Sequence, residues 1–168
     1  MPRAPPAALL LLALAGCGYR VVTPYRARGG IDRIHVGVFE NDSADPELGA
    51  AVTAAMRDEL ARRGAYAGAD APAQLDGVVR AASGTPSSYF SSATAVSVQV
   101  HVRLSVDGKL VQELTVQRTE PHEGGADPLE SEGRRATAVR KLARDAAREV
   151  LRELEEPPPS GPAGTGKS

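Results

Sequence analysis

The residue type best suited to chemistry in this chain is cysteine, which occurs only once, at Cys17. The chain starts with a positive charge at Arg3, continues as an apolar run over residues 7–15, and has Gly16 before the cysteine. The apolar run is too short to cross a bilayer as a helix, which takes about 20 residues, but it suits the core of a signal peptide. A single thiol has no partner for an internal disulfide, which indicates another use.

The small residues before Cys17 resemble the lipobox of bacterial lipoprotein precursors. We therefore predict a signal peptide over residues 1–16 and acylation of Cys17, which becomes the first residue of the mature protein. Each buried methylene contributes about 0.8 kcal/mol, so two or three acyl chains hold a protein firmly on a membrane. The residue after the cysteine is Gly18 rather than aspartate, which favours the outer membrane. The alternative is an ordinary secretory signal whose removal leaves a free cysteine.

The three histidines, His35, His101 and His122, are the other candidates for chemistry. None has another histidine or a cysteine at metal-ligand spacing, so we expect solvated side chains and no metal site. The paired glycines do not have the spacing of a phosphate-binding loop, and no set of nucleophile, base and acid stands out. The sequence therefore predicts a protein that is not an enzyme and that needs no cofactor.

Charge and composition limit the remaining classes. The chain has 20 basic and 21 acidic residues, so no basic excess points to nucleic acid. Aromatic residues make up only 4% of the chain, so a core must be built from Val, Leu, Ile and Ala. No second apolar run approaches the length of a membrane-spanning helix, which leaves the lipid as the predicted anchor.

The first half of the chain predicts a strand, a helix and a weaker strand. Residues 31–39 alternate as a strand does, and residues 45–64 form a helix with Asp45 as its cap and Gly64 as its end. Residues 74–82 read as a strand that Gly77 interrupts. Residues 83–93 read as a loop, in which Tyr89-Phe90 either contacts a lipid or barrel partner or covers an edge of the sheet.

The clearest pattern lies in residues 96–106, where valine and leucine alternate strictly with polar residues. Such a strand is buried on one face only. Asp107-Gly108 then predicts a hairpin turn into a return strand. A two-residue loop would place polar residues opposite the valines, so we predict a three-residue loop with a glycine bulge, which sets Leu104 opposite Leu110 and Val98 opposite Val116.

The last predicted element is a long helix that opens with Asp127, Pro128 and Glu130, which form a capping box. Together the elements predict an α+β two-layer sandwich in the order βαβββα. Its four-stranded, mostly antiparallel sheet carries two helices on one face. We expect a lipidated tether over residues 17–30, the folded domain over 31–156 and a disordered tail over 157–168.

This assembly of parts resembles the LptE family of lipopolysaccharide-assembly lipoproteins, from Cys17 to about residue 155. The resemblance rests on several short motifs and on a long terminal helix: Cys-Gly-Tyr-Arg at 17–20, Phe39-Glu40-Asn41, Pro46-Glu47-Leu48 and Ser88-Tyr89. Gly77 within the second strand and the Pro/Gly-rich tail depart from the family pattern. The family implies an outer-membrane lipoprotein that plugs the LptD β-barrel and helps deliver lipopolysaccharide to the cell surface.

An anionic lipid of this kind requires cations beside apolar surface. Arg103 on the hairpin and Lys109 at its tip are the candidates, since the predicted loop turns both side chains away from the core. The alternative is that Arg103 pairs with Glu113 and Lys109 keeps the turn soluble. A second function also stays open, that of a periplasmic adaptor lipoprotein similar to activators of peptidoglycan synthases.

Overall fold

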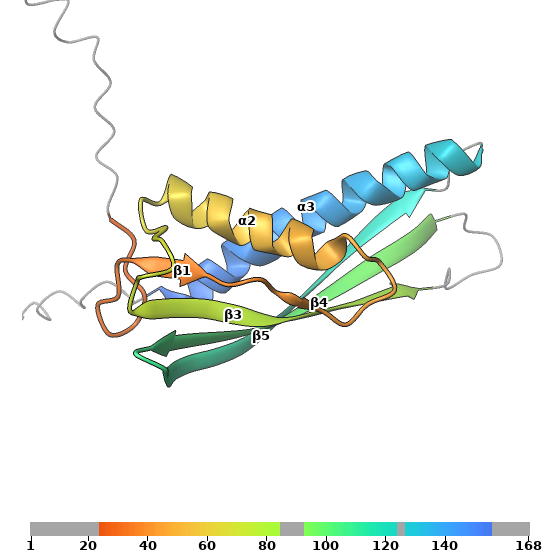
Figure 1. Cartoon of the computed structure of the whole chain (residues 1–168). Helices are drawn as coiled ribbons and strands as arrows, with labels where there is room; N and C mark the ends of the chain where they lie inside the picture. The colour runs from red at the N-terminus through yellow and green to blue at the C-terminus, as the bar shows by residue number, and fades with distance from the viewer. Residues whose placement is uncertain (1–23, 85–92, 124–126, 156–168) are drawn as a thin grey trace, which may run out of the picture.

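A computed structural model describes residues 24–84, 93–123 and 127–155. Its elements follow in the order β1 (Ile34–Val36), β2 (Glu40–Asn41), α2 (Leu48–Arg62), β3 (Ala73–Gly84), β4 (Ala93–Val106), β5 (Lys109–Glu123) and α3 (Pro128–Leu154). Both helices lie over one face of a single sheet, as Figure 1 shows. The predicted α+β class is confirmed. The leader, Cys17, Tyr89-Phe90 and the tail lie outside the described residues.

The sheet differs from the prediction at its first strand. Residues 31–39 do not form one strand but lead through β1 to β2, and both pair in parallel with the same edge of β3. Val36 pairs with Leu75 and Glu40 with Val78, so the first segment has one residue more than β3 over the same distance. The sheet thus contains five strands rather than four. On the other edge of β3, β4 and β5 continue antiparallel.

The extra residue turns Phe39 into the core, where it is 2% exposed, and leaves Val38 75% exposed. The ring fits because β3 carries Gly77 at this point. A Cβ on Gly77 would lie 2.9 Å from Phe39 Cε1 and 2.0 Å from the carbonyl oxygen of His101. The prediction that Gly77 interrupts this strand is therefore wrong. Gly77 lies within β3 and allows the close approach of a large side chain.

The β4–β5 hairpin has a two-residue turn, and the predicted three-residue loop is wrong. Asp107 and Gly108 both have positive φ, at 49° and 75°, as a type I′ turn requires. The extra residue that keeps the apolar side chains of both strands on one face is instead Val111. Ser105 pairs with Leu110 and Leu104 pairs with Gln112, so Val111 has no partner on β4. This bulge places Val100 opposite Val116, so the buried face of the hairpin is kept.

The two helices begin differently. Asp127 caps α3 as predicted, accepting a hydrogen bond from the backbone N–H of Glu130 at 2.8 Å, with Pro128 in the first turn. In contrast, α2 starts at Leu48, and Asp45 accepts instead from the backbone N–H of Glu47 at 3.1 Å. Figure 1 shows that both helices run in the same direction across the sheet. Their apolar sides, with β1, β3, β4 and β5, enclose the core.

Residues 24–31 pack against the ends of both helices. Tyr25 and Ala27 are buried in the core cluster, and Ala27 forms bridges with Ile31 and Glu155. The backbone N–H of Arg28 donates to the carbonyl oxygen of Leu154 at 2.9 Å. This segment belonged to the predicted tether over 17–30, but the packed part of the chain already begins within it.

Candidate functional site

The sheet face turned away from the helices carries Arg103 within a row of polar side chains. Its guanidinium donates to Asp76 Oδ1 on β3, with nitrogen–oxygen distances of 3.1 Å from both Nε and Nη2. Glu113 lies beside His101, with Nε2 2.8 Å from Oε1, and His101 Nδ1 lies 3.0 Å from Thr115 Oγ1. Arg103 thus pairs with the strand on its other side, and the expected pairing with Glu113 is wrong.

Lys109 does not join Arg103 on that face. Lys109 pairs in register with Val106, which packs against the core on the helix side of the sheet. Because residues opposite one another share a face, Lys109 also lies on the helix side. The expectation that both cations turn away from the core on one side is therefore wrong. A ligand contact of Arg103 and one of Lys109 would therefore lie on opposite faces of the hairpin.

A cavity of about 230 Å³ lies under α3, at the end of the sandwich remote from the β4–β5 turn. Its lining is largely apolar and comes from the loop before α2, from the first residue of α2, from both strands of the β3–β4 pair and from α3: Ala44, Asp45, Leu48, Ala81, Val96, Arg135 and Val139. A second hollow, between the first turns of α2 and α3, shares Asp45, Arg135 and Val139 with it. The cavity therefore sets one arginine beside apolar surface.

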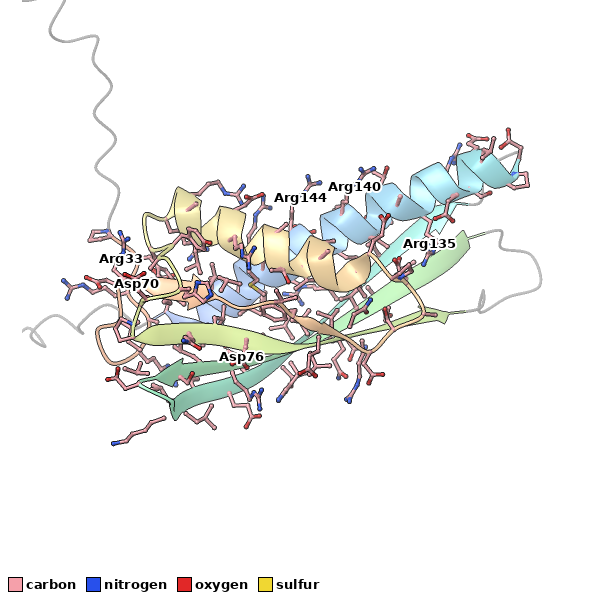
Figure 2. All side chains as sticks on the ribbon, in the orientation of Figure 1. Arg33, Asp70, Asp76, Arg135, Arg140 and Arg144 are labelled. Atoms are coloured by element: carbon pink, nitrogen blue, oxygen red, sulfur yellow. The ribbon has the colours of Figure 1, made fainter. Side chains whose placement is uncertain are left out.

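Arg135 is fixed by two carboxylates. Its Nη2 lies 3.0 Å from Asp45 Oδ2 and its Nη1 lies 3.2 Å from Glu132 Oε1, and the Asp45 side chain is only 11% exposed. The bridge joins α3 to the loop before α2 and leaves Asp45 Oδ1 to accept from the backbone N–H of Glu47. Figure 2 shows Arg135 on the side of α3 that faces this loop.

The sequence carries a signal for this site, although the predicted candidates were the histidines and the hairpin cations. Arg135 stands four residues before Val139, so it falls on the buried stripe of the last helix rather than on its solvated side. A charged residue on a buried stripe calls for a partner, because an unpaired charge there is costly. Asp45 is that partner, but 90 residues separate the two.

A second charged cluster joins the other ends of the helices. The Glu59 carboxylate accepts hydrogen bonds from Arg62 and Arg63 and lies 3.9 Å from Arg148 Nε on α3. Burial alone would raise the pKa of Glu59, but the hydrogen bonds from Arg62 and Arg63 outweigh it and lower the pKa below the usual range of a glutamate. The cluster keeps its charge at neutral pH and holds α2 to α3.

Among the described side chains, no three of His, Cys, Asp and Glu gather as a metal site would require. His35 Nδ1 lies 3.4 Å from the carbonyl oxygen of Ala67, His101 faces Glu113 on the solvated sheet, and the side chain of His122 lies outside the described residues. No helix in the described part of the chain is long and apolar enough to cross a membrane.

Fold and surfaces together define a small α+β domain, with one solvated sheet face and helices on the other. A family model described as "LptE: Lipopolysaccharide-assembly" matches residues 31–154. The chain belongs to the LptE family of lipopolysaccharide-assembly proteins. No curated protein sequence matches it.

Solved structures share the fold at low sequence identity. Rare lipoprotein B from Shewanella oneidensis is 17% identical with a TM-score of 0.52, over 69% of this chain and 92% of that one. A minor lipoprotein from Acinetobacter baumannii is 10% identical with a TM-score of 0.52, over 75% and 97%. PelC from Paraburkholderia phytofirmans, a dodecamer, is 18% identical with a TM-score of 0.53, over 80% and 96%.

Proposed function

We propose that this chain is an outer-membrane lipoprotein, anchored through acylated Cys17, that binds lipopolysaccharide and assists its assembly as the plug subunit of an LptD-like β-barrel. The observation that carries the proposal is the family match over residues 31–154, which covers nearly the whole described fold. The lipobox-like sequence before Cys17 supplies the anchor. The proposed activity is transport and assembly of lipopolysaccharide, without a covalent change to it.

The sheet supports a role inside a barrel. The lumen of an outer-membrane barrel is polar, so a plug needs a polar surface against it. The face of β3–β5 turned from the helices meets this need, because most of its side chains are hydroxyls, amides and paired charges, with Val78 and Leu110 among the exceptions. Ser97 and Thr119 lie 2.7 Å apart through their hydroxyl oxygens, and Arg103 is balanced by Asp76. This face has both donors and acceptors to offer to a lumen wall.

For the ligand, Arg103 and Lys109 remain the proposed contacts with lipopolysaccharide phosphates. Because they lie on opposite faces of the hairpin, each would meet a different phosphate. Arg135 also stands beside apolar surface, which is the same chemical requirement. Its charge is already balanced by Asp45 and Glu132, so a phosphate there would have to displace one of the carboxylates.

The direct test is purification of the tagged lipoprotein from detergent-solubilised outer membranes. We expect a large β-barrel protein to purify with it in stoichiometric amount, and lipopolysaccharide to be present in the complex. The matched control is Val100→Asp, which keeps the leader and Cys17 but disrupts the core, since Val100 is fully buried. A peptidoglycan enzyme in place of the barrel would support the adaptor function instead and refute the plug role.

A further inference from the structure

Three segments that are far apart in the sequence meet at the last turn of α3. The backbone N–H of Arg28 donates to the carbonyl oxygen of Leu154 at 2.9 Å, and Gln112 Nε2 donates to that of Glu153 at 3.2 Å. Residues 24–33, the hairpin tip at 107–112 and residues 152–155 therefore form one end of the molecule. Figure 1 shows the hairpin tip and the first described residues at this end. We call it the anchor-proximal end.

The chain between Cys17 and this end is short. Six residues lie between Cys17 and Pro24, and the seven Cα–Cα steps that join the two span at most about 25 Å when the chain is fully extended. Tyr25 and Ala27 are buried at 3% and 0% exposure, so the domain is held firmly at the point where the described chain begins. An acyl anchor at Cys17 would therefore keep the anchor-proximal end within about 25 Å of the membrane.

The surface of this end combines cations with exposed apolar side chains. Arg26, Arg28 and Lys109 are exposed, and none has a carboxylate at ion-pair distance among the described residues. Leu110 and Val111, which follow Lys109 on the hairpin, are 58% and 45% exposed. They are two of the large apolar side chains that the described surface leaves exposed: the two-residue turn sets Leu110 opposite Ser105 on the solvated face, and the bulge leaves Val111 without a partner on β4.

Acidic residues are also present here, and those that form ion pairs do so with other arginines. Glu155 pairs with Arg63 at 3.3 Å and Glu153 lies 3.8 Å from Arg152, while Asp32 and Asp107 are exposed and, within the described residues, pair with none of Arg26, Arg28 and Lys109. Arg33 adds a further exposed cation, and Figure 2 shows it at this end, with Asp70 nearby. Within residues 24–33, which lead directly from the anchor, three arginines face one aspartate. Basic residues are therefore in excess in the segment next to the proposed anchor.

We propose that the anchor-proximal end is a membrane-contact surface, on which Arg26 and Arg28 bind anionic phospholipid headgroups while Leu110 and Val111 enter the headgroup layer. Basic residues close to an anchor are attracted by anionic lipids, and apolar side chains beside them add burial at the interface. The proposal rests on the Cys17 anchor of the proposed function. It fixes the orientation of the domain, with the cavity beside Arg135 directed away from the bilayer.

The absence of tryptophan from the chain provides a probe of this orientation. Leu110→Trp places a single tryptophan at the proposed contact. Leu129→Trp is the matched control, because Leu129 is 87% exposed at the opposite end of α3. Residues 17–168 are coupled through the Cys17 thiol to a maleimide lipid in phosphatidylcholine vesicles, with or without phosphatidylglycerol. Quenching by brominated lipids then reports how close each tryptophan lies to the membrane.

In vesicles that contain phosphatidylglycerol, we expect quenching of Trp at position 110 to be at least about twofold stronger than at 129. Removing the anionic lipid, raising the salt or adding Arg26→Glu with Arg28→Glu should reduce the difference, because each weakens headgroup attraction. Equal quenching at both positions would overturn the proposal, and so would equal quenching at 110 with and without anionic lipid.

The coupling supplies the anchor whether or not cells acylate Cys17, so the two proposals fail separately. Mature protein without acyl mass would refute the natural anchor and leave the vesicle result intact. Anchored protein that shows no preference for position 110 would refute the contact surface and leave the anchor intact. Unchanged thermal unfolding of the tryptophan and glutamate variants serves as the folding control, since all the substituted side chains are exposed.

Discussion

The Tyr25 hydroxyl donates a hydrogen bond to the main-chain carbonyl oxygen of Leu151 at 3.0 Å, across 126 residues of sequence. The Arg63 guanidinium carbon lies 5.3 Å from the centroid of the Tyr25 ring. Burial raises the pKa of Tyr25 well above its usual value, although the charge of Arg63 opposes this change. The hydroxyl therefore stays protonated and remains a donor wherever the protein is folded.

Tyr25→Phe tests this contact directly. We expect a loss of about 1 kcal/mol in the free energy of unfolding, because the ring stays in place and a buried carbonyl loses its side-chain donor. Urea denaturation provides the measurement. Tyr66→Phe is the control, since Tyr66 is 36% exposed and should change stability little. Equal stability of the Tyr25 variant and the native protein would mean that residues 24–31 do not help to hold the fold together.

The two faces of β4 should respond differently to a charge. Val100→Asp buries a carboxylate without a partner among the described residues, which costs several kcal/mol and approaches the whole stability of a small domain, roughly 5–15 kcal/mol. Gln99→Asp, on the solvated face, should cost less than about 1 kcal/mol. Circular dichroism with thermal unfolding measures both. Equal damage at the two positions would indicate that another layer covers the polar face.

Glu59→Gln should destabilise the protein in a pH-dependent way. The lowered pKa of Glu59 means that its stabilisation is present above the usual pKa of a glutamate and is lost as the pH falls through the lowered value. We expect the variant to be about 1 kcal/mol less stable at neutral pH, with the difference shrinking in acid. Urea denaturation across this range is the measurement, and the exposed Glu47→Gln is the control. A difference that grows toward low pH would contradict the assignment.

Arg103→Glu and Lys109→Glu should weaken binding of purified lipopolysaccharide at low salt. Because the two residues lie on opposite faces of the hairpin, we expect each single variant to weaken binding and the double variant to show the sum of both effects. Arg103→Glu also breaks the pair with Asp76, which should cost under about 1 kcal/mol. Unaltered binding by the double variant would leave the ligand contacts at another site, with the cavity beside Arg135 as the next candidate.

Cys17→Ala should abolish the anchor. We expect an unprocessed precursor or a soluble form, while the native protein partitions into detergent and carries acyl mass in mass spectrometry. The described domain does not include Cys17, so thermal unfolding of its core should be unchanged. Native protein without acyl mass would instead support an ordinary secretory signal and a free thiol.

Local patterns in the sequence predicted much of the fold because their physical causes are also local. The strict alternation of residues 96–106 gives β4 one buried and one solvated face, with Val98, Val100 and Val102 fully buried. Asp127 caps α3 through a hydrogen bond to Glu130, three residues away. Gly64, with a φ of 70°, ends α2 as its position indicated.

The features that were missed depend on contacts between distant residues. Gly77 looked like a break in a strand because its role depends on Phe39, which packs where a Cβ would lie. The hairpin needs one extra residue, as parity required, but the preference of Asp-Gly for a two-residue turn moved the bulge to Val111. Arg135 and Asp45 could not be paired from spacing alone, so the cavity they border was not predicted.

The contact between Tyr25 and Leu151 also has a consequence for the order in which the domain folds. The β4–β5 hairpin closes over two residues, whereas the ends of the domain must be brought together across more than a hundred. Loop closure costs more entropy for longer loops, so the hairpin should form early and residues 24–31 should dock last. In a chain that crosses a membrane N-terminus first, Tyr25 stays without its acceptor until α3 has emerged. With the proposed acylation of Cys17, the domain then closes beside its own anchor.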